Sequence, residues 1–212
     1  MEEGTDLSNT EGGIVVGCRI VEAGAEAPDF VLKDQFDQEV ALKTYRGKYV
    51  VLAFHPLAWT PVCAEQMRTL DRHWALFEKF GAVCFGVSVD PVPTKKAWRE
   101  HLGLRNLRLL SDFWPHGAMS KDYGILREEG FSERAVVVVD PQGTVVYARV
   151  SPLGEAPSLK DLAFFLKDLT GADVDPNVEI ARCLADTRGG TVCMPDSRNA
   201  GLEDMRPGDQ EV

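Results

Sequence analysis

The stretch FHPLAWTPVC, residues 54–63, joins an apolar run to a helix and places a cysteine at the junction. The run at residues 49–54 is short, uninterrupted and bounded by turn residues, as expected for a central strand covered on both faces. Residues 61–80 carry apolar side chains at three- and four-residue spacing, which predicts a helix with one buried stripe. The chain is therefore expected to pass from a buried strand into a helix that begins close to Cys63.

Thr60 and Pro61 mark the start of that helix. The residue before a proline favours extended backbone, which an N-cap residue needs, and a proline suits the first helical position because its missing N–H has no intrahelical partner. Cys63 then falls in the first turn, where unpaired backbone N–H groups and the helix dipole favour a thiolate over a thiol. A thiolate is a nucleophile, so Cys63 is a candidate reactive residue; a small buried hydrophobic side chain is the alternative.

Further elements follow at regular spacing. Residues 83–89 form the next expected strand, and a β-α-β crossover of this length implies parallel, right-handed pairing with the strand before it. Residues 94–102 have the composition of a short surface helix capped by Thr94. A hairpin at 135–150, with a type I turn, and a helix at 158–170 complete a predicted α/β sandwich with a central mixed sheet flanked by helices.

Composition restricts the class of protein. With 44% hydrophobic residues and a formal charge of −10, the 212-residue chain suits one domain with a sizeable core and disfavours nucleic acid as a partner. It contains no apolar run of membrane-spanning length, so no membrane association is expected. The few histidines are scattered without ligand spacing, so no metal and no other cofactor is expected. The acid-rich start resembles neither a secretory signal nor a transit peptide, which indicates a cytoplasmic location.

We expect three regions along the chain. Residues 1–12 form a flexible acidic arm, and residues 13–171 form the domain. Residues 172–212 form a C-terminal tail whose Gly-, Asp- and Pro-rich ending does not favour a packed core, although a helix at 177–185 is possible within it.

The motif P-x-x-x-T-x-x-C, from Pro56 to Cys63, resembles the active-site signature of the peroxiredoxins, thiol peroxidases with a thioredoxin-like fold. Further segments resemble that family in the family's own order: DQFDQEV at 34–40, FGVSVD at 85–90, LSDFWPHG at 110–117 and ERAV at 133–136. The resemblance covers roughly residues 22–196. It implies a thioredoxin-like sandwich, with a core similar to the one-cysteine-like branch and a tail similar to the two-cysteine branch.

The resemblance assigns roles to four residues. Cys63 would be the nucleophile that attacks the peroxide, and Arg134 would hold the thiolate and the peroxide oxygens by charge-assisted hydrogen bonds. Thr60 would offer its hydroxyl to the peroxide, although it could instead cap the helix. Pro56 would screen the thiolate from water.

Two positions depart from the family pattern. Gln66 stands where the family commonly has a glutamate that orients the arginine; an amide oxygen can still accept a hydrogen bond but adds no negative charge. His55 replaces an aromatic residue that often precedes the motif proline. It could titrate near neutrality and tune the pocket, but a packing or solvent-facing role is the expectation.

The tail contains the segment GTVCMP at 190–195, which resembles the Val-Cys-Pro segment of two-cysteine peroxiredoxins with Met194 inserted. A thiol that attacks peroxide becomes a sulfenic acid, which another thiol must capture before further oxidation. Cys193 is therefore the candidate resolving cysteine. Cys183 and an external thiol remain alternatives.

The resemblance implies an enzyme that reduces hydrogen peroxide and organic hydroperoxides and is recycled by a thioredoxin-like or other dithiol donor. It also implies a homodimer, or a ring of dimers, with an inter-subunit disulfide. The alternatives are a non-enzymatic peroxide sensor or chaperone, or a one-cysteine peroxidase resolved by an external thiol. A dithiol oxidoreductase is disfavoured because Gln66 occupies the second position of its Cys-x-x-Cys motif.

Overall fold

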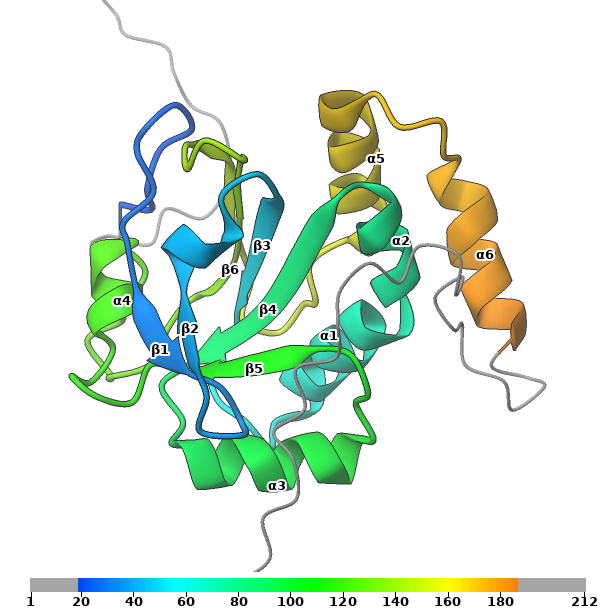
Figure 1. Cartoon of the computed structure of the whole chain (residues 1–212). Helices are drawn as coiled ribbons and strands as arrows, with labels where there is room; N and C mark the ends of the chain where they lie inside the picture. The colour runs from blue at the N-terminus through cyan, green and yellow to red at the C-terminus, as the bar shows by residue number, and fades with distance from the viewer. Residues whose placement is uncertain (1–18, 187–212) are drawn as a thin grey trace, which may run out of the picture.

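The computed structural model describes residues 19–186, which fold around one seven-stranded sheet with the order β2-β1-β5-β4-β3-β6-β7 (Figure 1). The strands are β1 (Val31–Lys33), β2 (Glu39–Ala41), β3 (Tyr49–Phe54), β4 (Ala82–Ser88), β5 (Arg108–Ser111), β6 (Arg134–Val139) and β7 (Val145–Ser151). The helices are η1 (Leu42–Tyr45), α1 (Pro61–Arg72), α2 (Trp74–Lys79), α3 (Val92–Leu102), α4 (Ala118–Asp122), α5 (Leu159–Thr170) and α6 (Pro176–Asp186). The predicted mixed sheet flanked by helices is confirmed.

The parallel pairing that the sequence predicts for the strands at 49–54 and 83–89 is confirmed. β3 pairs in parallel with β4, and β4 pairs in parallel with β5, so the carboxyl ends of these three strands lie at one edge of the sheet. β6 pairs with β3 in the opposite direction, with Ala135 opposite Phe54. The start of β6 therefore lies beside the end of β3, and Arg134 is adjacent to the loop that leads to Cys63.

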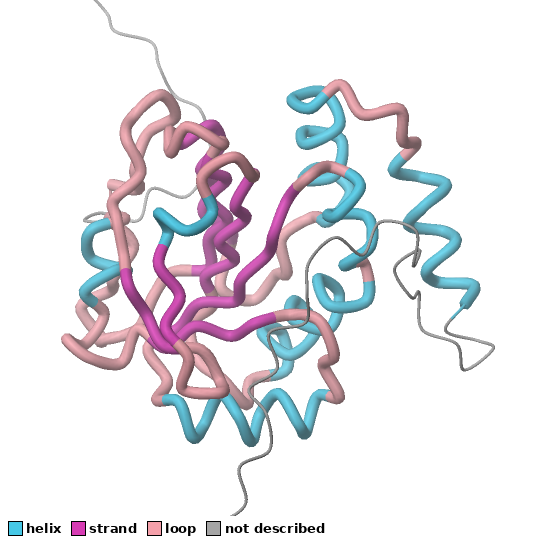
Figure 2. Tube along the Cα trace, viewed as in Figure 1, coloured by secondary structure: helices cyan, strands magenta, loops and turns pink. Residues whose placement is uncertain are grey.

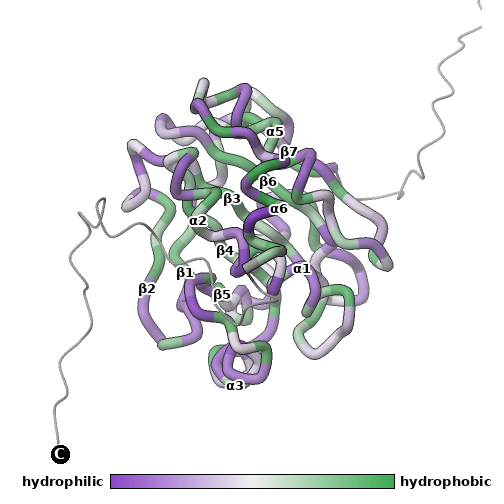
Figure 3. The backbone as a smooth tube through the Cα atoms, turned by 90° about the vertical axis from the view of Figure 1, so that its right-hand side faces the viewer, coloured by the Kyte–Doolittle hydropathy of each residue, from purple (hydrophilic) through white to green (hydrophobic). Residues whose placement is uncertain are grey.

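Each face of the sheet is covered by its own hydrophobic cluster. Alternate residues of β3 point to opposite faces: Val51 and Ala53 pack toward α1, α2 and α5, whereas Leu52 and Phe54 pack toward α4 and the β1–β2 hairpin. The helices accordingly lie outside the strands (Figure 2), and the central strands β3 and β6 are strongly hydrophobic (Figure 3). The sheet is buried on both sides and gives the loops at its edge a rigid support.

The predicted helix at 61–80 is wrong in one respect, because it is divided at His73 into α1 and α2. His73 has φ −100° and ψ 21°, and its ring Nδ1 lies 2.8 Å from the carbonyl oxygen of Thr69. A side chain that binds the preceding turn competes with the helical backbone and favours a break. The break lies far along the helix from Cys63 and leaves the first turn intact.

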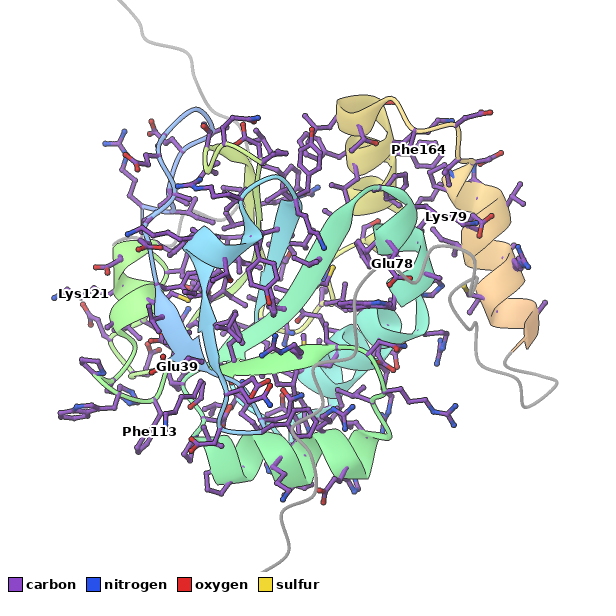
Figure 4. The ribbon with its side chains drawn as sticks, viewed as in Figure 1. Glu39, Glu78, Lys79, Phe113, Lys121 and Phe164 are labelled. Atoms are coloured by element: carbon purple, nitrogen blue, oxygen red, sulfur yellow. The ribbon has the colours of Figure 1, made fainter. Side chains whose placement is uncertain are left out.

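α6 follows the sandwich and packs against α2 and α5. Lys79 at the end of α2 forms an ion pair of 2.7 Å with Glu179 on α6, and in Figure 4 Lys79 lies between α2 and α6. α6 contains Cys183, whose side chain is buried. The boundary between domain and tail at residue 171 stays a prediction. The acidic arm at 1–12 also stays a prediction, because it lies outside the described residues, as does Cys193.

The last helix of the sandwich begins and ends as its sequence predicts. The Ser158 hydroxyl accepts a hydrogen bond from the Asp161 N–H at 3.1 Å, and Gly171 adopts the left-handed conformation, φ 64°, that ends the helix.

None of the helices in the described part of the chain is long and apolar enough to cross a lipid bilayer.

Candidate active site

Cys63 is the third residue of α1, as the sequence predicts. Thr60 adopts extended backbone, with φ −99° and ψ 144°, and Pro61 occupies the first helical position. The Ala64 N–H donates to the Thr60 carbonyl at 2.9 Å, which closes the first turn. The side chain of Cys63 is 0% exposed and packs in the hydrophobic cluster under α1.

Arg134, the first residue of β6, places its guanidinium against the sulfur. Its Nη2 donates to Cys63 Sγ at 3.3 Å and to the Leu153 carbonyl at 2.8 Å, and its Nε donates to the same carbonyl at 3.1 Å. Its Nη1 donates to Gln66 Oε1 at 2.5 Å. The guanidinium is thus fixed on three sides, by the helix that carries the cysteine and by the chain that follows β7.

These partners leave the guanidinium charge uncompensated. The amide oxygen of Gln66 and the carbonyl of Leu153 are neutral, so among these hydrogen-bond partners only Cys63 can become an anion. Arg134 is 2% exposed, and a buried charge is costly without a counter-ion. Among these partners, the Cys63 sulfur is therefore the one potential counter-ion of the guanidinium.

Gln66 keeps the orienting role that its sequence position indicates, through an amide instead of a carboxylate. Its Oε1 accepts from Arg134, as predicted, and its Nε2 donates to the Phe54 carbonyl at 3.4 Å. A glutamate could not make this second bond, because a carboxylate is an acceptor only. Gln66 thereby joins Arg134 to the end of β3.

The Thr60 hydroxyl does not cap α1. It donates instead to the Leu57 carbonyl at 3.1 Å, inside the loop that connects β3 to α1. Thr60 and Pro56 are both half-buried, whereas Cys63 is fully buried. The two residues therefore lie between solvent and the interior in the same loop.

Access to the sulfur requires movement. A hollow of about 40 Å³ between α1 and the start of α5 reaches Gln66, but Cys63 is not among the residues that line it. With no exposed surface on Cys63, neither water nor a peroxide touches the sulfur in this conformation. A displacement of the covering chain by the width of a small molecule would open it.

Two buried polar residues lie behind the loop, and one of them, Lys95, was missed in the sequence. Lys95, which the surface-helix prediction placed near solvent, is 0% exposed, and its Nζ lies 3.4 Å from His55 Nε2. His55 is buried and stacks on Trp98 at 5.2 Å between ring centroids. Burial, Lys95 and Arg134 hold the pKa of His55 well below its usual range, so it does not titrate near neutrality. The sequence contains one indication of this burial, because Lys95 precedes the buried Trp98 by about one helical turn and so lies on the same face of α3.

The remaining cysteines lie elsewhere. Cys84 is in the middle of β4 and Cys183 is on α6, and both are buried. Cys193, the predicted resolving residue, lies outside the described residues. The structure therefore brings Arg134 to Cys63, and Thr60 and Pro56 lie in the loop that precedes the cysteine.

This fold and site define a class. A cysteine that opens a helix at the end of a parallel strand, with a buried arginine from an antiparallel neighbour, is the arrangement of thiol peroxidases with a thioredoxin-like sheet. The chain belongs to the AhpC/TSA family, whose sequence model matches residues 23–148. It is a peroxiredoxin, a peroxidase that uses a thiol to reduce peroxides and depends on a reductant partner.

Individual relatives agree with this assignment. The chain is 43% identical over 138 residues to alkyl hydroperoxide reductase E of Mycobacterium tuberculosis, across 64% of this chain and 90% of that protein. It is 36% identical over 142 residues to peroxiredoxin-2 of Mus musculus, across 62% and 71%. The solved structure of reduced 2-Cys peroxiredoxin from Plasmodium vivax has a TM-score of 0.63 and 30% identity, covering 69% of this chain and 95% of that one. The branch within the family stays a prediction.

Proposed function

We propose that Cys63 is the residue that reacts with the peroxide and that Arg134 is its charged partner. The observation that carries this proposal is the 3.3 Å hydrogen bond from Arg134 Nη2 to Cys63 Sγ, made by a guanidinium whose other partners are neutral. The thiolate attacks one peroxide oxygen, an S–O bond forms and the O–O bond breaks. Cys63 becomes a sulfenic acid, and the departing hydroxide or alkoxide takes a proton to leave as water or an alcohol.

Thr60 and Pro56 complete the site in this proposal. Arg134 donates to the peroxide oxygens where negative charge develops, and the Thr60 hydroxyl turns from the Leu57 carbonyl to offer a second contact. Pro56 excludes water from the thiolate. Because Cys63 is covered, we expect the loop that carries both residues to move outward when a peroxide enters.

The test compares two buried thiols. Cys63→Ser is expected to abolish the fast reaction with hydrogen peroxide in a stopped-flow experiment that follows tryptophan fluorescence. Cys84→Ser is the matched control, because Cys84 is equally buried and lies in the same hydrophobic cluster. Peroxide turnover that is undiminished in Cys63→Ser would end the proposal.

We also propose that Cys193 resolves the sulfenic acid, on the support of the GTVCMP segment. Its thiolate attacks Cys63–SOH, a disulfide forms and water leaves. After one equivalent of peroxide, non-reducing electrophoresis should show a disulfide-linked dimer that Cys193→Ser loses and Cys183→Ser keeps. A dimer lost only in Cys183→Ser would assign resolution to that residue, and no dimer in the unsubstituted protein would indicate an external thiol.

A thioredoxin-like or other dithiol donor would return the disulfide to thiols, in a reducing compartment such as the cytoplasm. Cys63 and Cys84 are free thiols, which suits that setting. A coupled assay should show NADPH consumption that depends on peroxide, donor and Cys63. No consumption with any dithiol donor would favour the sensor or chaperone alternative.

A homodimer is supported by exposed apolar side chains on the loops after β3 and β5. Leu57 and Trp59 lie on the first loop, and Phe113 and Trp114 lie on the second, where Trp114 is 81% exposed. Phe113 points away from the body of the molecule (Figure 4). Exposed apolar groups of this kind mark contact surfaces. Trp114→Asp should reduce the dimer fraction in sedimentation, whereas Val178→Asp, at an exposed apolar position on α6, should leave it unchanged.

A further inference from the structure

A buried lysine lies behind the loop that connects β3 to α1. Lys95 is 0% exposed, and its ammonium donates to Ser88 Oγ and to His55 Nε2, the latter at 3.4 Å. Ser88 Oγ in turn donates to Asp90 Oδ2 at 2.6 Å. A fully buried ammonium is rare, and its charge must be stabilised by the groups around it.

Both chains of hydrogen bonds lead to the loop that carries the site. Asp90 Oδ2 accepts from the Ala58 N–H at 2.9 Å, so Lys95 reaches the middle of the loop through Ser88 and Asp90. His55 is the first residue of the loop, and its carbonyl accepts from Ser132 Oγ at 3.0 Å. Lys95 therefore supports the loop at two points, on either side of Pro56.

The charges around Lys95 include the reactive sulfur. Burial lowers the pKa of Lys95 to about 8, against the opposing effects of Asp90, Cys63 and Asp112, in that order. His55, from the end of β3, is neutral and accepts through Nε2, and Arg134 lies beyond it. No hydrogen bond of ordinary geometry is formed by His55 Nδ1, and a weak interaction with the Leu57 backbone raises its pKa slightly.

We propose that Lys95 is a second cation of the active site, a positioning residue that holds the loop through Ser88, Asp90 and His55 and stabilises the thiolate of Cys63 together with Arg134. The proposal rests on the proposed role of Cys63. It differs from a purely structural role for Lys95 in one respect: the protonation state of the ammonium controls the reactivity of the sulfur. Arg134 acts by direct contact, and Lys95 acts through the loop and through charge.

The test is the pH profile of the second-order rate constant for hydrogen peroxide, measured by stopped flow from pH 4 to 10. In the unsubstituted protein the rate should fall near pH 8, when Lys95 loses its proton. In Lys95→Met this falling limb should disappear. Lys96→Met, an exposed lysine one position along the same helix, should retain it.

A Lys95→Met profile that superimposes on the unsubstituted one would overturn the proposal. If that variant fails to fold, His55→Phe replaces it, because phenylalanine keeps the stacking on Trp98 and removes the acceptor of the ammonium. Its falling limb should move to lower pH, and an unmoved limb overturns the proposal. Loss of reactivity in Cys63→Ser with no pH effect of Lys95 would leave the proposed function standing and remove only this inference.

Discussion

Cys63 and Cys84 have the same burial and different surroundings. Both are 0% exposed and both belong to the hydrophobic cluster on the α1 face of the sheet. Cys63 opens a helix and receives a hydrogen bond from Arg134, whereas Cys84 lies in the middle of β4 with burial as the cause of its raised pKa. Burial alone disfavours a thiolate, so Cys84 stays a thiol.

The two sulfurs therefore differ in their hydrogen-bond donors and not in their exposure. A buried sulfur with no nearby cation behaves as a small apolar side chain. The sulfur of Cys63 instead has a buried guanidinium beside it. Cys63 therefore combines low solvent access with a charged partner that the protein itself supplies.

Of the changes predicted here, removal of the Arg134 guanidinium should have the largest effect, because it removes the donor that distinguishes Cys63 from Cys84. Arg134→Met is expected to lower the rate constant for hydrogen peroxide by about 10²–10³-fold, because a positioned donor to developing charge is lost. Arg134→Lys should recover only part of the rate, since one ammonium nitrogen with three donors cannot reproduce the four hydrogen bonds that the three guanidinium nitrogens make. Arg149→Met, at an exposed arginine on β7, is the control. An Arg134→Met rate within threefold of the control would show that Cys63 needs no cation.

The second prediction concerns the stability that the buried ammonium costs. The pKa of Lys95 falls from 10.5 to about 8, so between these pH values the unfolded chain binds a proton that the folded chain does not. The free energy of unfolding should therefore rise with pH across this window by about 3 kcal/mol relative to Lys95→Met, and the penalty is fully present below pH 8. Urea unfolding of both proteins at pH 7 and pH 10.5 measures this difference. Equal pH dependence in the two would show that Lys95 is not desolvated.

A smaller effect is expected at Thr60. Thr60→Val keeps the shape of the side chain and removes the hydroxyl, so the rate constant for peroxide should fall by about tenfold, as for the loss of one neutral hydrogen bond. Thr60→Ser should restore most of the rate. Because the hydroxyl does not cap α1, its removal in Thr60→Val should change the thermal midpoint of unfolding little. A Val variant as fast as the unsubstituted enzyme would remove Thr60 from the mechanism.

The smallest effect is expected at Cys84, the unreactive cysteine of the Cys63–Cys84 comparison. Cys84→Ala should leave the rate constant for peroxide within about twofold of the unsubstituted value, because a neutral buried thiol does not react. Peptide mass mapping after one equivalent of peroxide should find oxygen or a disulfide at Cys63 and an unmodified Cys84. Oxidation of Cys84 at a comparable rate would contradict the contrast between the two sulfurs.

Much of this arrangement could be predicted from the sequence. The apolar run, the Thr60–Pro61 helix start and the hairpin at 135–150 each carry a local signal, whereas the pairing of Arg134 with Cys63 was predicted from the resemblance to the peroxiredoxins. The β-α-β unit also predicts the parallel pairing of β3 with β4. Local patterns were sufficient where each residue acts through its own element.

The rest could not be predicted, for physical reasons that differ between residues. The Leu153 carbonyl that fixes Arg134 is a main-chain atom and leaves no mark in the side-chain pattern. His73 divides the helix through a side-chain contact with Thr69, although a histidine is compatible with either structure. Lys95 is charged, and charged residues are almost never fully buried, so an exposed position was predicted for it. Its spacing from the buried Trp98, which places both on one face of α3, was not enough to indicate burial.

The seat of Arg134 on the Leu153 carbonyl has an evolutionary consequence. A backbone oxygen is present whatever side chain stands at position 153, so the residue there can change freely while the guanidinium keeps its support. Insertions or deletions between β7 and α5 are different, since they move the oxygen itself. Within this family, the amino acid at position 153 should therefore vary, whereas the length of the loop between β7 and α5 should be restricted.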